Sequence, residues 1–313
     1  MSNSPDAPAS GIGASVGRAP VGEDRCGRAI LMIVLSSLSF GFVGIMVRLA
    51  GDIPVYEKVF FRSIVMLPVA AAFGARSGAR LLTWDRNTKW LVLRGIFGTI
   101  AMTLYFYAIE GLTLADATVL NKLSPFFVVV LAAIFLHEKL SKYVLPVLAI
   151  AFVGAAFVIQ PELKLSPRPA LAGLFSAVGS AAAYTVVRSL KGREAPFKIV
   201  FYFAMVSTVA MIPPMLVHAV TPTPQQFLAL VGAGVFATSG QLALTMGYQL
   251  APASRISIYV YAHVLFAGFL AYLFFSEVPD LLSIIGGGLV ILAAVLNYRL
   301  VRREPASPPA ATC

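Results

Sequence analysis

The sequence predicts an all-α membrane protein whose ten transmembrane helices form two inverted repeats of five helices each. Three observations predict this fold: an apolar composition, a series of apolar runs of about 20 residues, and a similarity between the two halves of the chain. Hydrophobic residues make up 58% of the 313 residues and charged residues 12%, with a mean hydropathy of +0.84. A soluble domain carries roughly twice that share of charge, so the composition favours a chain that is solvated by lipid.

The apolar runs are each long enough to cross the hydrocarbon core as a helix. The segments between them are short, which favours antiparallel neighbours in a compact bundle. The expected spans are 29–50, 54–75, 88–109, 113–136, 141–160, 168–188, 196–219, 225–249, 253–276 and 279–300. In the last span, Gly286, Gly287 and Gly288 interrupt no helical pattern, so we expect them to allow close packing against another helix.

These spans divide the chain into a first repeat over 28–161 and a second repeat over 168–300. We expect disordered cytoplasmic tails over 1–27 and 301–313, since both are rich in small residues and proline. The first tail has no apolar core, so we do not interpret it as a signal peptide.

The net charge of +10 comes from Lys and Arg residues that cluster between the apolar runs. This clustering is typical of a membrane topology signal and not of nucleic-acid binding. With the amino terminus in the cytoplasm, 18 of these residues, Arg94 among them, fall on the cytoplasmic side and 3 on the outer side. We therefore expect both termini in the cytoplasm.

The two halves of the chain align when the sequence is shifted against itself by 139 residues. Gly95 then meets Gly234 and Glu138 meets Glu277, and at a shift of 140 residues Arg48 meets Arg188. Because each repeat has five spans, an odd number, the second repeat enters the membrane upside down. Inverted repeats are the architecture of alternating access, so the pattern predicts a transporter. The paired Glu138 and Glu277 end their spans, which favours a structural role at helix ends.

Three stretches carry a family resemblance. They are Ser-Leu-Ser-Phe-Gly at 37–41, Glu-Lys-Val-Phe-Phe-Arg-Ser at 57–63, and the segment from Ala108 to Glu138 with Leu-Ala-Asp-Ala at 114–117 and Ser-Pro at 124–125. In these stretches the chain resembles the EamA family of the drug/metabolite transporter superfamily, over residues 28–300. The resemblance implies ten helices, cytoplasmic termini, a central cavity, and movement of metabolites such as amino acids, often outward, in the bacterial inner membrane.

The remaining three basic residues, Arg48, Arg62 and Lys122, fall inside expected spans, and two of them lie deep. Arg62 and Lys122 are each about eight or nine residues from the outer end, which places both ~12–14 Å deep, close to the midplane. Ionisable groups at this depth are costly and often functional. One hypothesis is that they hold a substrate carboxylate between them. The alternatives are that each pairs with a protein acid, such as Glu57 or Glu110, or extends outward to the headgroups.

The sequence around Lys122 predicts a weak point in the fourth span. Asn121 precedes Lys122, and Pro125, which lacks a backbone N–H, follows within one turn. Transporters place binding sites at such interruptions, so Asn121 and Lys122 are candidate substrate-binding residues. The alternative is a kink that serves only packing.

Further candidates lie in the second repeat. The ninth span carries Tyr259, Tyr261 and His263, and the eighth carries Gln241. His263 could exchange a proton near neutral pH, although a histidine in this setting also serves packing alone. Glu57 and Asp116, near the outer ends of their spans, are candidates for ion coupling, or are simply solvated at headgroup level.

Other chemistries find no support in the sequence. His137-Glu138 has Ser141 where a zinc peptidase needs its second histidine, and no nucleophile motif, phosphate loop, metal cluster or cofactor fingerprint is present. The two cysteines, Cys26 and Cys313, sit at opposite ends of the chain and predict no disulfide framework.

The favoured function is therefore a secondary transporter that moves an amino acid, a carboxylated metabolite or an opine-like metallophore, with export as the expected direction. The alternatives are a channel or a non-transporting membrane scaffold, and an intramembrane enzyme is the least favoured. The expected partners are a small-molecule substrate, the lipid bilayer and a coupling proton, with no nucleic acid. Monomer and homodimer both remain open.

Overall fold

The computed structural model describes residues 23–76, 78, 81–82, 85–135, 144–159, 167–190, 193–250 and 257–303. Within these ranges the chain forms helices and no strand. The first helix begins at Glu23, inside the segment expected to be a disordered tail, and the last helix ends at Arg303. Residues 1–22 and 304–313 of the expected tails lie outside the described residues.

The helices of the first half are α1 (Glu23–Leu49), α2 (Val55–Arg76), α3 (Thr88–Gly111), α4 (Leu114–Asn121), α5 (Ser124–Phe135) and α6 (Val144–Ile159). Those of the second half are α7 (Pro167–Ser189), α8 (Pro196–His218), α9 (Pro224–Leu250), the 3-10 helix η1 (Ser257–Tyr261), α11 (Ala262–Phe275) and α12 (Leu281–Arg303). In the described part of the chain, α1, α2, α3, α7, α8, α9 and α12 are long and apolar enough to cross a membrane. The chain is a multi-pass membrane protein.

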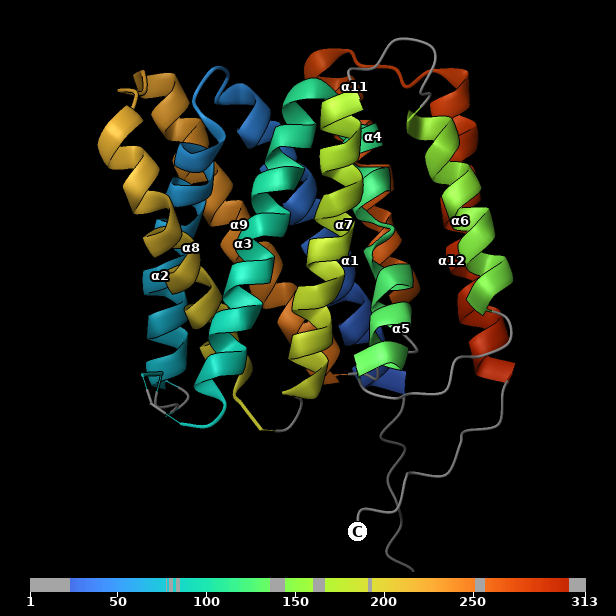
Figure 1. The fold of residues 1–313 in the computed structure, drawn as a ribbon, viewed down its shortest axis with the longest axis horizontal. Coiled ribbons are helices and arrows are strands. Elements are labelled where there is room, and N and C mark those ends of the chain that lie inside the picture. Colours follow the sequence, from blue (N-terminus) through green and yellow to red (C-terminus); the bar gives the residue numbers. More distant parts are fainter. Residues whose placement is uncertain are drawn as a thin grey trace, which may run out of the picture.

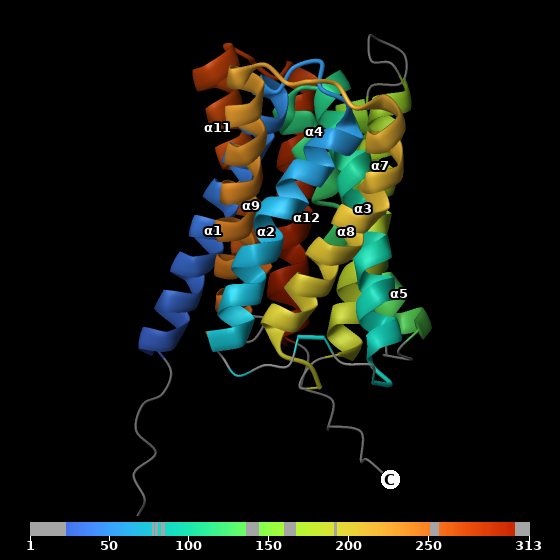
Figure 2. The ribbon, with the colours of Figure 1, turned by 90° about the vertical axis from the view of Figure 1, so that its left-hand side faces the viewer.

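The helices stand side by side in one bundle (Figures 1 and 2). Helix α1 begins and α12 ends at the same end of the bundle, the lower end in both views. Helices α6 and α12 pack against each other at one edge, on the right of Figure 1. Helices α1 and α7, which open the two repeats, run in opposite directions (Figure 1).

The packing pairs reveal the internal symmetry. Helix α1 packs on α9 as α3 packs on α7, and α2 packs on α9 as α8 packs on α3. The pairs α2–α8 and α6–α12 each map onto themselves when every helix is replaced by its counterpart in the other repeat. This is the pattern that a two-fold relation between two repeats produces, so the repeat seen in the sequence is present in the packing.

Individual glycines follow the same symmetry. A methyl group at Gly95 would lie 2.7 Å from the Cβ of Val206, and one at Gly234 would lie 2.6 Å from the Cβ of Val65. The Thr99 hydroxyl donates to the Gly95 carbonyl, and four residues after Gly234 a threonine does the same. Small residues allow helix backbones to approach closely in membranes, and here they do so at equivalent places in both repeats.

Close packing of the glycine run in α12 is confirmed at Gly286. A methyl group there would lie 2.5 Å from the carbonyl oxygen of Gly154 in α6, and one at Gly154 would lie 2.6 Å from the carbonyl oxygen of Gly286. The two backbones are therefore in direct contact. Gly288, two residues later, faces open space, since nothing lies within 4 Å of its methyl position.

The expected fourth span is two helices, α4 and α5, separated at Lys122 and Leu123. Pro125 has no N–H to give to the Asn121 carbonyl, and the N–H of Phe126 donates to the Leu123 carbonyl at 3.0 Å. The helical ladder is therefore broken at the residue that the sequence singled out. The second repeat changes from η1 to α11 after Tyr261, which is the counterpart of Lys122.

Candidate functional site

Two arginine side chains of the first repeat are buried together against one aromatic ring of the second. Arg62 of α2 is 6% exposed and Arg94 of α3 is 5% exposed. Their guanidinium carbons lie 5.5 and 4.0 Å from the ring centroid of Phe203 on α8. In the described part of the structure, Nη1 of Arg62 and both Nε and Nη1 of Arg94 have no hydrogen-bond partner. The ring stabilises the cations but does not neutralise them.

A glycine makes room for this arrangement. A methyl group at Gly98 would lie 2.7 Å from Nη1 of Arg94 and 2.8 Å from Cε2 of Phe203. The Arg94 side chain therefore runs along α3 toward Gly98, away from the end where the helix begins. Arg94 is among the basic residues that predict the topology, and its side chain is buried within the bundle.

The acids proposed as partners of Arg62 are engaged elsewhere. Oε1 of Glu57 accepts the backbone N–H of Val220 at 2.6 Å. Oε1 of Glu110 accepts a hydrogen bond from Nζ of Lys58 at 2.6 Å. The charged neighbour of Arg62 is instead another cation, Arg94, with the phenol of Tyr184 nearby. Neither expected acid accounts for Arg62.

Lys122 forms a second cationic centre. It follows the last residue of α4, at the break in the span, and is half-buried. Its electrostatic neighbour is His263 of α11, which is 4% exposed. The centroid of the His263 ring lies 6.1 Å from that of Phe40, and the Phe40 backbone is its hydrogen-bonding neighbour. The hypothesis that Lys122 and Arg62 hold one carboxylate between them stays a prediction. The titratable neighbour of Lys122 is His263, and that of Arg62 is Arg94.

The remaining candidates differ in their surroundings. Nδ2 of Asn121 donates to Oγ of Ser176 on α7 at 3.0 Å, so this amide holds two helices together. Tyr261 is 7% exposed, whereas Tyr259 is 37% exposed. Gln241 is half-buried on α9. Their roles as substrate-binding residues stay predictions.

Asp116 and Glu57, the candidates for ion coupling, are buried at helix ends and not solvated, with exposures of 5% and 1%. The Thr113 hydroxyl donates to Oδ2 of Asp116 at 2.7 Å and accepts the Asp116 N–H at 3.1 Å. The Thr113 hydroxyl therefore caps the start of α4, and the Asp116 carboxylate holds that hydroxyl in place. Glu57 similarly satisfies a backbone N–H in the connection that follows α8.

An ion pair links the ends of several helices where α1 ends. Arg48 of α1 donates to Oε1 of Glu277, which follows α11, and to the carbonyl oxygens of Ile109 and Leu112 at the end of α3. Oε2 of Glu277 accepts the backbone N–H of Leu114 at 3.3 Å. Arg48 thus satisfies the free carbonyls of one helix and Glu277 the free N–H of the next. Glu277 has the structural role that the sequence indicated.

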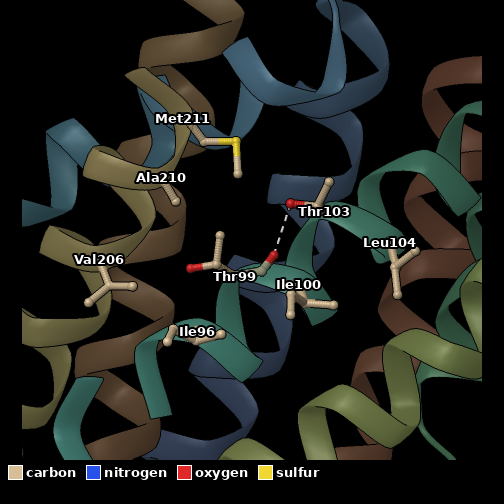
Figure 3. A pocket seen from close by; sticks show the side chains of 8 residues that line it. All are labelled: Ile96, Thr99, Ile100, Thr103, Leu104, Val206, Ala210 and Met211. Atoms are coloured by element: carbon tan, nitrogen blue, oxygen red, sulfur yellow. Dashed lines mark hydrogen bonds between the residues drawn. The ribbon is translucent and has the colours of Figure 1, made fainter. Parts of the chain in front are cut away.

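A pocket of about 330 Å³ lies between α3 and α8 (Figure 3). Its lining residues are Ile96, Thr99, Ile100, Thr103, Leu104, Val206, Ala210 and Met211. The hydroxyl of Thr103 donates to the Thr99 carbonyl at 2.9 Å, and that of Thr99 bonds Oγ of Ser207 at 2.6 Å. With these hydroxyls occupied the pocket is apolar, and none of the sequence-predicted site residues lines it.

A family model described as the EamA-like transporter family matches the chain twice, over residues 27–160 and 168–299. The chain belongs to the EamA-like transporter family. Both matches together cover most of the sequence, so the repeat in the packing is the two-repeat architecture of this EamA protein.

Named relatives of this EamA chain are transporters. It is 34% identical over 273 residues to the pseudopaline exporter CntI of Pseudomonas aeruginosa, covering 86% of this chain and 95% of the relative. It is 26% identical to the S-adenosylmethionine uptake transporter of Rickettsia bellii, covering 77% and 81%. A crystal structure with 18% sequence identity matches its fold with a TM-score of 0.63, covering 88% of this chain and 98% of the other.

Proposed function

We propose that this EamA protein is a secondary transporter that moves a small carboxylated metabolite outward across the bacterial inner membrane by alternating access. The class of metabolite includes amino acids and opine-like metallophores. The observation that carries the proposal is the presence of buried cations without acidic partners, within the described residues, where the two repeats meet. Unbalanced buried charge is costly, and an anionic substrate would balance it.

The proposed membrane topology has ten spans. Besides the seven long helices, α4 and α5 together form one span, α6 forms a second, and η1 with α11 forms a third. An even number of spans agrees with α1 beginning and α12 ending at one end of the bundle. The excess of Lys and Arg at that end supports a cytoplasmic location for both termini.

The proposed substrate path runs between the repeats beside the break at Lys122. The candidate contacts are Arg62, Asn121, Lys122, Gln241, Tyr259, Tyr261 and His263. His263 would exchange the coupling proton, because its buried imidazole can gain and lose a proton. The Arg48–Glu277 pair would close the outer side, since it joins helices of both repeats there.

The direction is supported by the relative named as an exporter, which matches almost over its full length. The family also contains a relative named as an uptake transporter, so family membership alone does not set the direction. For this reason the test measures flux from both sides of the membrane.

The experiment is counterflow in proteoliposomes with radiolabelled glutamate and a synthetic opine-type metallophore. A transporter gives saturable uptake that rises when unlabelled substrate is present on the opposite side. We expect Lys122→Gln to lower the rate by about tenfold or more, because a charged contact to substrate is lost. Lys89→Gln is the matched control, since Lys89 is exposed at the start of α3.

The alternatives predict different results. A channel gives flux that does not saturate and is not stimulated from the opposite side. A non-transporting scaffold gives no flux above empty liposomes with either substrate. Equal rates for Lys122→Gln and Lys89→Gln would remove Lys122 from the proposed path.

A further inference from the structure

Arg62 and Arg94 are two buried cations that lie together without an anionic partner in the described structure. Both side chains are at least nine-tenths buried, and both contact the Phe203 ring. The distance between the two guanidinium carbons cannot exceed the two ring distances combined, so the cations are close neighbours. Like charges at this range repel, and low dielectric surroundings strengthen the repulsion. A bound anion removes the repulsion and accepts the unoccupied N–H groups.

The internal symmetry shows that the fold does not need these cations. The contact pairs Gly95–Val206 and Gly234–Val65 set the correspondence between the repeats. Under this correspondence the counterpart of Arg62 is Phe203, and the counterpart of Arg94 is an alanine at position 233, which is 1% exposed. The same packing positions are thus filled by apolar residues in the other repeat. The arginines occur on one side of the pseudo-symmetric bundle only.

An exposed tyrosine lies within electrostatic range of both guanidinium groups. The phenol of Tyr184 on α7 is an electrostatic neighbour of both Arg62 and Arg94. Tyr184 is 42% exposed, whereas both arginines are buried. Helices α2 and α3 of the first repeat and α7 and α8 of the second therefore converge on this site.

We propose that Arg62, Arg94 and Phe203 form a binding subsite for a carboxylate group of the transported metabolite. The two guanidinium groups donate paired hydrogen bonds to the carboxylate oxygens, as their planar fork allows, and the Phe203 ring supports the guanidinium planes. The subsite adds Arg94 and Phe203 to the substrate contacts of the proposed function. It rests on that function only for the statement that the carboxylate belongs to a transported metabolite.

The test is thermal unfolding of the purified full-length protein in detergent, with glutamate or succinate as the probe and inorganic phosphate and chloride as comparison anions. A ligand that binds the folded state raises the unfolding temperature. We expect both carboxylates to raise it for the wild type. Arg94→Met is expected to raise the unfolding temperature without anion, because a repelling buried charge is removed. It should also raise the half-saturating carboxylate concentration by about tenfold or more.

Three further variants sharpen the result. Arg94→Lys keeps the charge but loses the fork, so carboxylate binding should weaken less than in Arg94→Met. Phe203→Leu keeps the site apolar and should weaken binding without the gain in unliganded stability. Arg86→Gln, an exposed arginine near the start of α3, should behave as the wild type in every condition.

Several outcomes would overturn the subsite: no stabilisation of the wild type by either carboxylate, stabilisation by phosphate alone, or an Arg94→Met protein that is less stable and keeps the full carboxylate response. The proposed function fails separately. Carboxylate stabilisation without counterflow would keep the subsite and reject transport. Counterflow that is unchanged in Arg94→Met would keep transport and reject the subsite.

Discussion

At the scale of single residues, the same type of side chain has opposite roles in this protein. Both terminal nitrogens of Arg48 are engaged, one with Glu277 and the other with the carbonyl groups at the end of α3. Arg94 is buried with two nitrogen atoms unoccupied in the described structure. A buried cation with partners is a structural element, and one without partners is a candidate for ligand binding. The hydrogen-bond partners of the two arginines therefore distinguish their expected roles.

The Arg48–Glu277 pair yields a prediction at this scale. Arg48→Leu leaves the Glu277 carboxylate and two carbonyl groups without their donor, so we expect a loss of about 1–3 kcal/mol in the free energy of unfolding. The double variant Arg48→Leu/Glu277→Leu should lose less than the two single variants added together. Unfolding in detergent measures both. Arg168→Leu, at an exposed arginine of α7, is the control, and strict additivity would show that the ion pair contributes nothing.

At the scale of elements, helix contact in this bundle depends on backbone approach. Helices α6 and α12 meet at Gly154 and Gly286, where each glycine faces the carbonyl oxygen of the other. Because lipid tails solvate apolar side chains as well as a neighbouring helix does, close van der Waals contact holds such helices together. A backbone oxygen cannot move aside as a flexible side chain can.

Two alanine substitutions in α12 test this contact. Gly286→Ala places a methyl group 2.5 Å from the Gly154 oxygen, so the helices must separate, and we expect a loss of about 1–3 kcal/mol in stability. Gly288→Ala meets nothing within 4 Å and should leave stability unchanged or slightly raised, because alanine favours helix. Thermal unfolding of the two variants gives the comparison. Equal unfolding temperatures would mean that α6 and α12 are not held by this contact.

At the scale of the whole molecule, the two ends of the helical bundle differ in charge and in connection. The end where α1 begins and α12 ends lies with the segments that carry most of the Lys and Arg residues. The opposite end carries the Arg48–Glu277 pair. The counterpart of this pair in the aligned repeats involves Glu138, which lies outside the described residues. The proposed orientation places the basic end in the cytoplasm.

The two cysteines test the orientation directly. Cys26 and Cys313 lie near opposite ends of the sequence, and the excess of basic residues predicts that both face the cytoplasm. A membrane-impermeant maleimide should label both in inside-out vesicles and neither in spheroplasts. Cys26→Ser and Cys313→Ser assign the signals, and labelling after unfolding in detergent gives the total. Labelling of one cysteine in each preparation would place the ends on opposite sides and contradict ten spans.

The sequence by itself determined the membrane class, the long apolar helices, the two-repeat organisation and the interruption at Lys122. These features follow from local chemistry. Apolar runs set helix length, and a shift of 139 residues aligns the two repeats. The missing N–H of Pro125 removes a helical hydrogen bond whatever the tertiary packing. Arg62 and Lys122 were recognisable as unusual because their depth follows from their position within an apolar run.

Only the tertiary structure decided which of these side chains meet. Arg94 sits in a basic cluster near the start of its span, so its position indicates topology, whereas the crossing of α3 and α8 and the space left by Gly98 bring it to Phe203. Arg48 and Glu277 are 229 residues apart. Periodicity tells which face of a helix is apolar, but not which helix covers that face. Which charged side chains of the two repeats meet therefore depends on how the helices pack, and this packing is not visible in the sequence pattern.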